Sequence, residues 1–198
     1  MINNLFPTPV YYSSIEEDVL KKLQSDVTEY IASNEDLFKT NQWRCNTKTN
    51  IFCDENKKFF PTYLKELIIK NTSQYIVECN FKPRGFIVDE CWITVGGKGG
   101  YQELHDHLGA GTASNGFSGV MYISCSEDKG GEFIIQSPID TLAKLLPESE
   151  NELLAPQIGI EPQEGLLISF PSWLKHGSSQ YDCTEKKRIS ISWNIEFK

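Results

Sequence analysis

The segment that most constrains the fold is residues 188–197, Arg-Ile-Ser-Ile-Ser-Trp-Asn-Ile-Glu-Phe. Neighbouring side chains of an extended strand point to opposite faces, so this alternation predicts a strand with one apolar and one polar face. The apolar face carries Ile189, Ile191, Trp193, Ile195 and Phe197, and the polar face carries Arg188, Ser190, Ser192, Asn194 and Glu196.

Shorter strand-like segments, separated by turn residues, fill the chain from about residue 85, and two amphipathic helical patterns precede them, over 15–33 and from Pro61 to about residue 78. Helices followed by strands indicate an α+β protein, and short strands at regular intervals predict a double-sheet jelly roll. We therefore expect one mainly β domain over 1–198, with a β core over about 85–198 and helical support over 13–80, the helices packing on one sheet.

The composition narrows the possible partners and the compartment. A net charge of −8 over 198 residues argues against binding to nucleic acid or to anionic membranes. The chain has no apolar run of membrane-spanning length and no signal-like start, and none of its six cysteines forms a Cys-x-x-Cys pair. We expect reduced thiols and a cytoplasmic location.

The chain has three histidines, and two of them lie close together in Tyr101-Gln-Glu-Leu-His-Asp-His107. In an extended strand His105 and His107 share a face with Glu103, while Asp106 points the other way. A lone histidine in a β protein is more often a surface or core residue. The pair, together with His176 in a second β segment, favours a metal site for iron, copper, nickel or zinc.

Several motifs in order then carry a family resemblance: His105-x-His107, Phe117–Tyr122, Pro162-x-Glu-Gly165, Phe170–His176 and Arg188–Ser192. They resemble a 2-oxoglutarate/Fe(II)-dependent oxygenase family common in marine bacteria and their phages, within the prolyl-hydroxylase-like double-stranded β-helix superfamily. The resemblance covers about 91–197. It implies Fe(II), 2-oxoglutarate as cosubstrate, O2, and a hydroxylase that couples oxidative decarboxylation of 2-oxoglutarate to substrate oxidation.

By this resemblance His105 is the first metal ligand and His176 the distal one, but the usual carboxylate position holds His107. Three alternatives stay open: Glu103 supplies a carboxylate, Asp106 does so if the strand kinks, or His107 is the first ligand with Gly109 at the carboxylate position, as in halogenating relatives. We expect His105, His107 and His176 to bind the metal together.

The Arg188-x-Ser190 pair resembles the family's clamp for the far carboxylate of 2-oxoglutarate, with Tyr122 as a third hydrogen-bond donor. A solvated charge at a strand end is the other interpretation of Arg188. Trp173 and Tyr101 are expected to be packing residues.

Two other functions compete with the oxygenase. One is a cupin-like three-histidine dioxygenase that does not use 2-oxoglutarate, and the other is a catalytically inactive jelly-roll binding module. The substrate is expected to be a small molecule or a protein side chain, and the location a host cytoplasm if the protein is phage-encoded.

Overall fold

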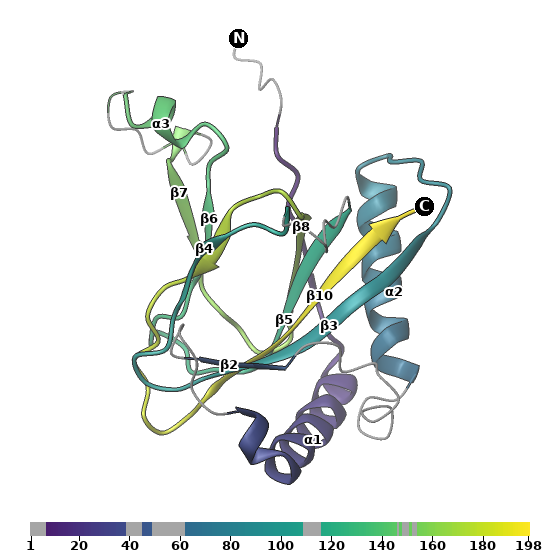
Figure 1. Cartoon of the computed structure of the whole chain (residues 1–198), viewed down its shortest axis with the longest axis vertical. Helices are drawn as coiled ribbons and strands as arrows, with labels where there is room; N and C mark the ends of the chain where they lie inside the picture. Colours follow the sequence, from purple (N-terminus) through teal and green to yellow (C-terminus); the bar gives the residue numbers. More distant parts are fainter. Residues whose placement is uncertain are drawn as a thin grey trace.

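The computed structural model describes residues 7–38, 45–48, 62–108, 116–145, 147, 151 and 154–198. Two antiparallel sheets carry the described part of the chain, with two long helices beside the larger sheet (Figure 1). The helical elements are α1 (Glu17–Ser33), the 3-10 turn η1 (Glu35–Phe38), α2 (Thr62–Glu78) and α3 (Asp140–Ala143). The strands are β1 (Tyr11–Ser14), β2 (Cys45–Lys48), β3 (Phe86–Gly96), β4 (Gln102–His105), β5 (Phe117–Ser124), β6 (Phe133–Gln136), β7 (Gln157–Ile160), β8 (Leu166–Pro171), β9 (His176–Ser178) and β10 (Arg188–Phe197).

The larger sheet has the strand order β1-β8-β5-β10-β3-β2, and the smaller one has the order β4-β9-β6-β7. From β3 to β10 the chain passes repeatedly between the two sheets, as in a double-stranded β-helix. This confirms the predicted mainly β jelly roll. Strands β1 and β2, which come from the helical half of the sequence, extend the larger sheet at its two edges.

One hydrophobic core lies between the helices and the outer face of the larger sheet. Helix α1 buries Leu23, Val27 and Tyr30, which recur at the spacing of one helix face. They belong to the same buried cluster as Trp193 on β10. Gly119 on the neighbouring strand β5 makes room for the indole, because a Cβ there would lie 2.2 Å from the Trp193 ring. This packing fixes β10 with its apolar face outward, toward the helices.

A second, smaller core lies between the two sheets, and its members come from the inner faces of β5, β8 and β6 and from the turn between β8 and β9. It contains Val120, Tyr122, Phe133, Ile135, Ile168, Phe170 and Leu174. The polar face of β10 points into this space, so buried polar groups lie next to apolar ones between the sheets. Buried polar side chains next to apolar ones are typical of a ligand-binding site, so the space between the sheets is a candidate site.

Several local predictions need correction. The sequence over 5–12, with its two prolines, predicts an opening edge strand, whereas the strand in the structure is Tyr11–Ser14 and residues 1–6 lie outside the described part. Ser14, three residues before Glu17, predicts a capping box, but none forms, because Glu16 is the N-cap of α1 and no side chain caps the helix. The sequence over 141–146 predicts a short helical turn, and the structure has one over Asp140–Ala143. Residues 101–107 do not form one strand, since β4 ends at His105.

Two of the compositional expectations can also be compared with the structure. Along the described ranges, no helix has the length and the apolar character that crossing a bilayer requires. Four described cysteines, Cys79, Cys91, Cys125 and Cys183, are free thiols.

Candidate active site

The three histidines, far apart in the sequence, lie together at one end of the space between the sheets. His105 on β4 pairs directly with His176 on β9, and their ring centroids are 4.4 Å apart. The His107 ring lies 4.9 Å from that of His176 and 5.4 Å from that of His105. One nitrogen of each ring lies within 4.8 Å of the other two, so the three could bind one metal ion. The predicted convergence is therefore present.

A β-bulge in β4 shifts the register of the strand just before His105. Gln102 lies opposite Ser178 and His105 opposite His176, so three steps along β4 match two along β9. Gly177 allows the bulged strand to come close, because a Cβ there would lie 2.6 Å from the Gln102 carbonyl oxygen. The extra residue in β4 breaks the alternation that the sequence predicted for this segment.

The carboxylates of the alternative ligands lie outside the histidine cluster. Glu103 is exposed and lies outside the histidine cluster, so the prediction that it shares the face of His105 is wrong. The Asp106 carboxylate accepts a hydrogen bond from the Leu108 backbone N–H at 3.1 Å, which caps the turn after β4 and keeps the carboxylate out of the cluster. Gly109 lies outside the described residues.

Hydrogen bonds set the tautomer of all three imidazoles. The Nδ1 atoms of His105 and His176 each lie 2.8 Å from a backbone carbonyl oxygen, of Glu103 and Leu174 respectively. The Nδ1 atom of His107 lies 2.7 Å from the Asn194 Oδ1 atom. A carbonyl oxygen only accepts hydrogen bonds, so each Nδ1 must carry the proton. The lone pair is then on Nε2, the arrangement in which a second partner orients a metal-ligating histidine.

The surroundings keep His107 and His176 uncharged, as metal ligation requires. Burial, with a smaller effect from the neighbouring His105, lowers the pKa of His107 from 6.5 to about 4. Burial and then the two other histidines hold the pKa of His176 well below its usual value. Both rings are therefore neutral at pH 7.

At the start of β10 lies a buried cation, Arg188, that has no anionic partner among the described residues. Arg188 is only 8% exposed, and within the described residues its side chain donates one hydrogen bond, from Nη1 to the Gly131 carbonyl oxygen at 3.3 Å. No carboxylate of the described residues forms an ion pair with it. Its guanidinium carbon lies 5.7 Å from the centroid of the Tyr122 ring. A buried guanidinium costs considerable free energy without a counter-charge, so this end of the interior suits an anion.

Two buried hydroxyls in this part of the interior also lack partners. Within the described residues, the Tyr122 hydroxyl and the Ser178 Oγ atom make no hydrogen bond. Burial raises the pKa of Tyr122 to about 12, so its hydroxyl keeps the proton that it can donate. Ser190 is also buried and lies directly opposite Tyr122 in the strand register. Three hydroxyl-bearing side chains and one guanidinium therefore converge on the interior.

Sequence reasoning missed Ser178 and Asn194 as site residues. A signal existed for both, because Ser178 follows His176 by two positions on the same strand and Asn194 shares the polar face of Arg188. It was not recognised because neither serine nor asparagine suggests a particular chemistry by itself.

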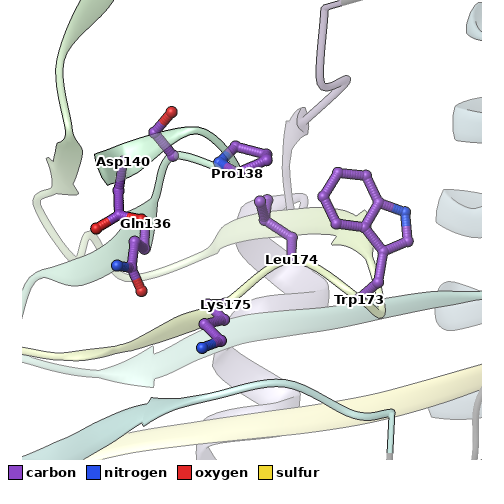
Figure 2. A pocket seen from close by; sticks show the side chains of 7 residues that line it. Gln136, Pro138, Asp140, Trp173, Leu174 and Lys175 are labelled. Atoms are coloured by element: carbon purple, nitrogen blue, oxygen red, sulfur yellow. The ribbon is translucent and has the colours of Figure 1, made fainter. Parts of the chain in front are cut away.

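A pocket of about 240 Å³ lies beside the histidine cluster, lined by Gln136, Ser137, Pro138, Asp140, Trp173, Leu174 and Lys175. Trp173 is 44% exposed, so its predicted role as a packing residue is wrong. Figure 2 shows the Trp173 and Leu174 side chains projecting to the same side of the turn between β8 and β9. Leu174, which lines this pocket, also contacts His176 through its backbone carbonyl oxygen, so one residue connects the pocket to the histidine cluster.

Solved structures share this fold. A prolyl-4-hydroxylase from Pseudomonas putida matches with a TM-score of 0.63 and 13% identity, over 96% of this chain and 93% of that chain. A Trichoplax adhaerens prolyl hydroxylase bound to a hypoxia inducible factor peptide matches with a TM-score of 0.63 and 12% identity, over 94% of this chain and 83% of that chain. EctD from S. alaskensis with 2-oxoglutarate and 5-hydroxyectoine matches with a TM-score of 0.65 and 12% identity, over 96% of this chain and 72% of that chain.

The family comparison is more specific than the fold. The sequence matches no curated protein. A model of a 2OG-Fe(II) oxygenase family matches residues 90–194, which span β3 to β10 and include all three histidines and Arg188. The match covers slightly more than half of the 198 residues. The chain therefore belongs to this family of 2OG-Fe(II) oxygenases, enzymes that use Fe(II) and 2-oxoglutarate.

Proposed function

We propose that His105, His107 and His176 hold the Fe(II) of this oxygenase through their Nε2 atoms, and that Arg188 binds the far carboxylate of 2-oxoglutarate. The observation that carries the proposal is the pairing of three converging imidazoles with a buried guanidinium that has no counter-charge among the described residues. A keto acid that spans both features would meet a metal at one end and a cation at the other.

Tyr122, Ser190 and Ser178 complete the proposed cosubstrate site. The guanidinium presents paired donors that match a carboxylate, and charge-assisted hydrogen bonds are the strong ones. The Tyr122 hydroxyl, which has no hydrogen-bond partner among the described residues, is available to donate a further bond to the same carboxylate. Ser178, on the strand that carries His176, would contact the cosubstrate between its two ends.

The three-histidine set changes the charge of the proposed centre. Two imidazoles and a carboxylate leave Fe(II) with one net positive charge, whereas three neutral imidazoles leave it with two. The stronger positive charge favours the anionic keto acid. When bound, the iron and the cosubstrate supply the oxidative chemistry, and the protein supplies their orientation and the exclusion of water.

We infer that the substrate is a small molecule or a protein side chain and that the pocket beside Trp173 receives part of it. Two similar structures are prolyl hydroxylases, one of them bound to a peptide fragment, and a third contains 5-hydroxyectoine. The pocket combines an exposed indole with amide, carboxylate and ammonium groups. Such a mixture suits a partly apolar substrate with polar groups.

We also infer one domain over 1–198, with a catalytic jelly-roll core over about 85–198 and helical support over 13–80, and a cytoplasmic location. The shared core between α1, α2 and the larger sheet supports the first inference. The four free thiols are compatible with the second.

The test measures binding and turnover separately. Wild-type protein should bind one Fe(II) per chain, and anaerobic addition of 2-oxoglutarate should give the weak visible charge-transfer band of a keto acid chelated to iron. Succinate should form in air. Arg188→Met should weaken 2-oxoglutarate binding and leave Fe(II) binding unchanged.

The same variant separates a second candidate. A three-histidine centre also suits a cupin-like dioxygenase that does not use a keto acid. If Arg188→Met leaves 2-oxoglutarate binding unchanged, or if 2-oxoglutarate produces no band on the iron-loaded protein, the proposed cosubstrate site is wrong.

A further inference from the structure

The surroundings of His107 contain a row of buried and half-buried polar side chains that the proposed function does not explain. Asn194 on β10 lies directly opposite Glu90 on β3 and opposite Ser118 on β5, so the three side chains form one row across the larger sheet. Asn194 is 5% exposed and Ser118 is 1% exposed. Buried polar groups of this kind persist where their hydrogen bonds are all satisfied.

The contacts of Asn194 fix the direction of every hydrogen bond in the row. The Asn194 Nδ2 atom donates to the Glu90 Oε2 atom at 3.3 Å. Its Oδ1 atom accepts from Ser118 Oγ at 2.9 Å and lies 2.7 Å from His107 Nδ1. Ser118 Oγ also lies 2.7 Å from His107 Nδ1, and it accepts in this contact because its own proton goes to Asn194. Since the Ser118 proton is used in this way, the 3.0 Å contact between the hydroxyls of Ser118 and Ser172 requires Ser172 to donate.

Glu90 is the group that sets this direction. An ionised carboxylate only accepts hydrogen bonds, so it selects the NH2 end of the Asn194 amide. The carbonyl end must then face His107. A carbonyl oxygen 2.7 Å from a ring nitrogen requires a proton between them, so Nδ1 of His107 is the protonated nitrogen. The lone pair of His107 is thereby placed on Nε2.

We propose that Glu90 and Asn194 are positioning residues that make position 107 specific for imidazole and unsuited to the carboxylate usual at this position in the family. The proposal rests on His107 being a metal ligand. A carboxylate at position 107 would face the Asn194 carbonyl oxygen, acceptor against acceptor. It could accept from the neighbouring Ser118 hydroxyl only by taking the proton that Ser118 donates to Asn194. Asn194 cannot turn its amide to donate to that carboxylate, because its carbonyl would then face the Glu90 carboxylate.

Replacing Glu90 by Gln removes this restriction, because a primary amide both donates and accepts. In the Glu90→Gln variant the Asn194 amide is able to take either orientation. The substitution should therefore have little effect when residue 107 is His, and it should rescue the variant in which residue 107 is Asp. A role for Glu90 as a structural surface charge predicts no such rescue.

The first measurement requires no substitution in the row. In 15N-labelled protein loaded with Zn(II), long-range 1H–15N correlation spectra report the tautomer of each histidine. His107 should be protonated at Nδ1 and bound to the metal through Nε2. A metal-bound Nδ1 or a protonated Nε2 at His107 would overturn the proposal.

The second measurement is Co(II) affinity by titration of the metal-free protein. Asn194→Leu should weaken Co(II) binding about 10- to 100-fold, the usual effect of losing a partner that orients a metal ligand. Glu90→Gln should stay within about threefold of wild type. His107→Asp should bind weakly, and the His107→Asp/Glu90→Gln double variant should recover roughly tenfold or more, a coupling typical of side chains in one network.

Glu196→Gln provides the matched control, because Glu196 is on the same strand as Asn194 but pairs with Lys198 rather than with the row. Glu196→Gln should leave the Co(II) affinity unchanged, both in the otherwise wild-type protein and in the His107→Asp variant. No rescue by Glu90→Gln, or equal rescue by Glu196→Gln, would contradict the proposal. Failure of the proposed function looks different, since His107→Ala would then bind Co(II) as tightly as wild type.

Discussion

The two faces of β10 differ in what they contribute, although each is largely buried. The outward face carries Ile191, Trp193 and Ile195, all fully buried against the helices. The inward face carries Arg188, Ser190 and Asn194, which are nearly as buried but lie among groups that lack partners or hold His107. Burial of apolar groups stabilises the fold, whereas burial of polar groups costs free energy that bound ligands can offset. Substitutions on the two faces should therefore separate stability from binding.

The largest change in stability is expected from a substitution on the outward face of β10. Trp193→Ala leaves a cavity beneath the helices and should lower the free energy of unfolding by about 3–5 kcal/mol. Urea denaturation of the purified protein measures this change. Fe(II) affinity of the fraction that remains folded should stay at the wild-type value. A weakening of metal binding in step with stability would show that the two faces are not separable.

The next largest effect is expected on metal binding, from a substitution in the space that the inward face of β10 borders. His176→Ala removes a proposed metal ligand and should weaken Fe(II) binding by more than about 100-fold, beyond the range for outer partners of a ligand. The midpoint of thermal unfolding of the metal-free protein should fall little. Equilibrium dialysis with Fe(II) under anaerobic conditions measures the first quantity and calorimetry the second. Wild-type metal content in this variant would exclude His176 as a ligand.

Arg188→Met should produce a smaller loss, confined to the cosubstrate. Removing a charged hydrogen-bonding group from the proposed carboxylate site should cost about 1.5–3 kcal/mol, or roughly 10- to 150-fold in 2-oxoglutarate affinity. Stability should not fall, because the variant also removes a buried charge that has no anionic partner in the described part of the molecule. Calorimetric titration of the metal-loaded protein checks the affinity. Tyr122→Phe should show a smaller loss in the same direction.

The smallest effect is a pH dependence of stability in the metal-free protein. His107 has a pKa of about 4 in the folded state and an ordinary value of 6.5, so the unfolded chain binds more protons between these values. Stability should therefore be unaffected by this group above pH 6.5 and should fall as the pH drops from 6.5 toward 4. The partial exposure of the ring limits the loss to about 1–2 kcal/mol.

The comparison of wild type with His107→Asn isolates this contribution from the carboxylates that titrate in the same range. Free energies of unfolding at pH 7.5 and pH 5 should differ less in the variant than in wild type. Equal pH dependence in both proteins would show that His107 is not neutral and buried in the folded state.

The sequence predicts the jelly roll, the helices on one sheet and the meeting of the three histidines, because each depends on a periodic pattern or on a rare residue type. Alternation along β10 places Arg188 and Ser190 inside, and the scarcity of histidine directs attention to position 176. The position of Glu103 was predicted wrongly, since the bulge in β4 depends on the close approach permitted by Gly177, which no local pattern signals.

The exposed position of Trp173 and the hydrogen-bond row through Asn194 were also not predicted. Trp173 lies in the turn between β8 and β9, where hydrophobicity alone does not decide burial. The row depends on register between β3, β10 and β5, and cross-strand partners come from separate parts of the chain. Periodicity within one segment shows the face of a residue but not its neighbour across the sheet.

A crystal structure of the protein with Mn(II) and 2-oxoglutarate tests the central claim most directly. We expect Nε2 of His105, His107 and His176 on the metal, with the keto acid end of the cosubstrate beside them and its far carboxylate on the Arg188 guanidinium. A metal held by a carboxylate in place of His107, or a cosubstrate whose far carboxylate lies away from Arg188, would contradict the account.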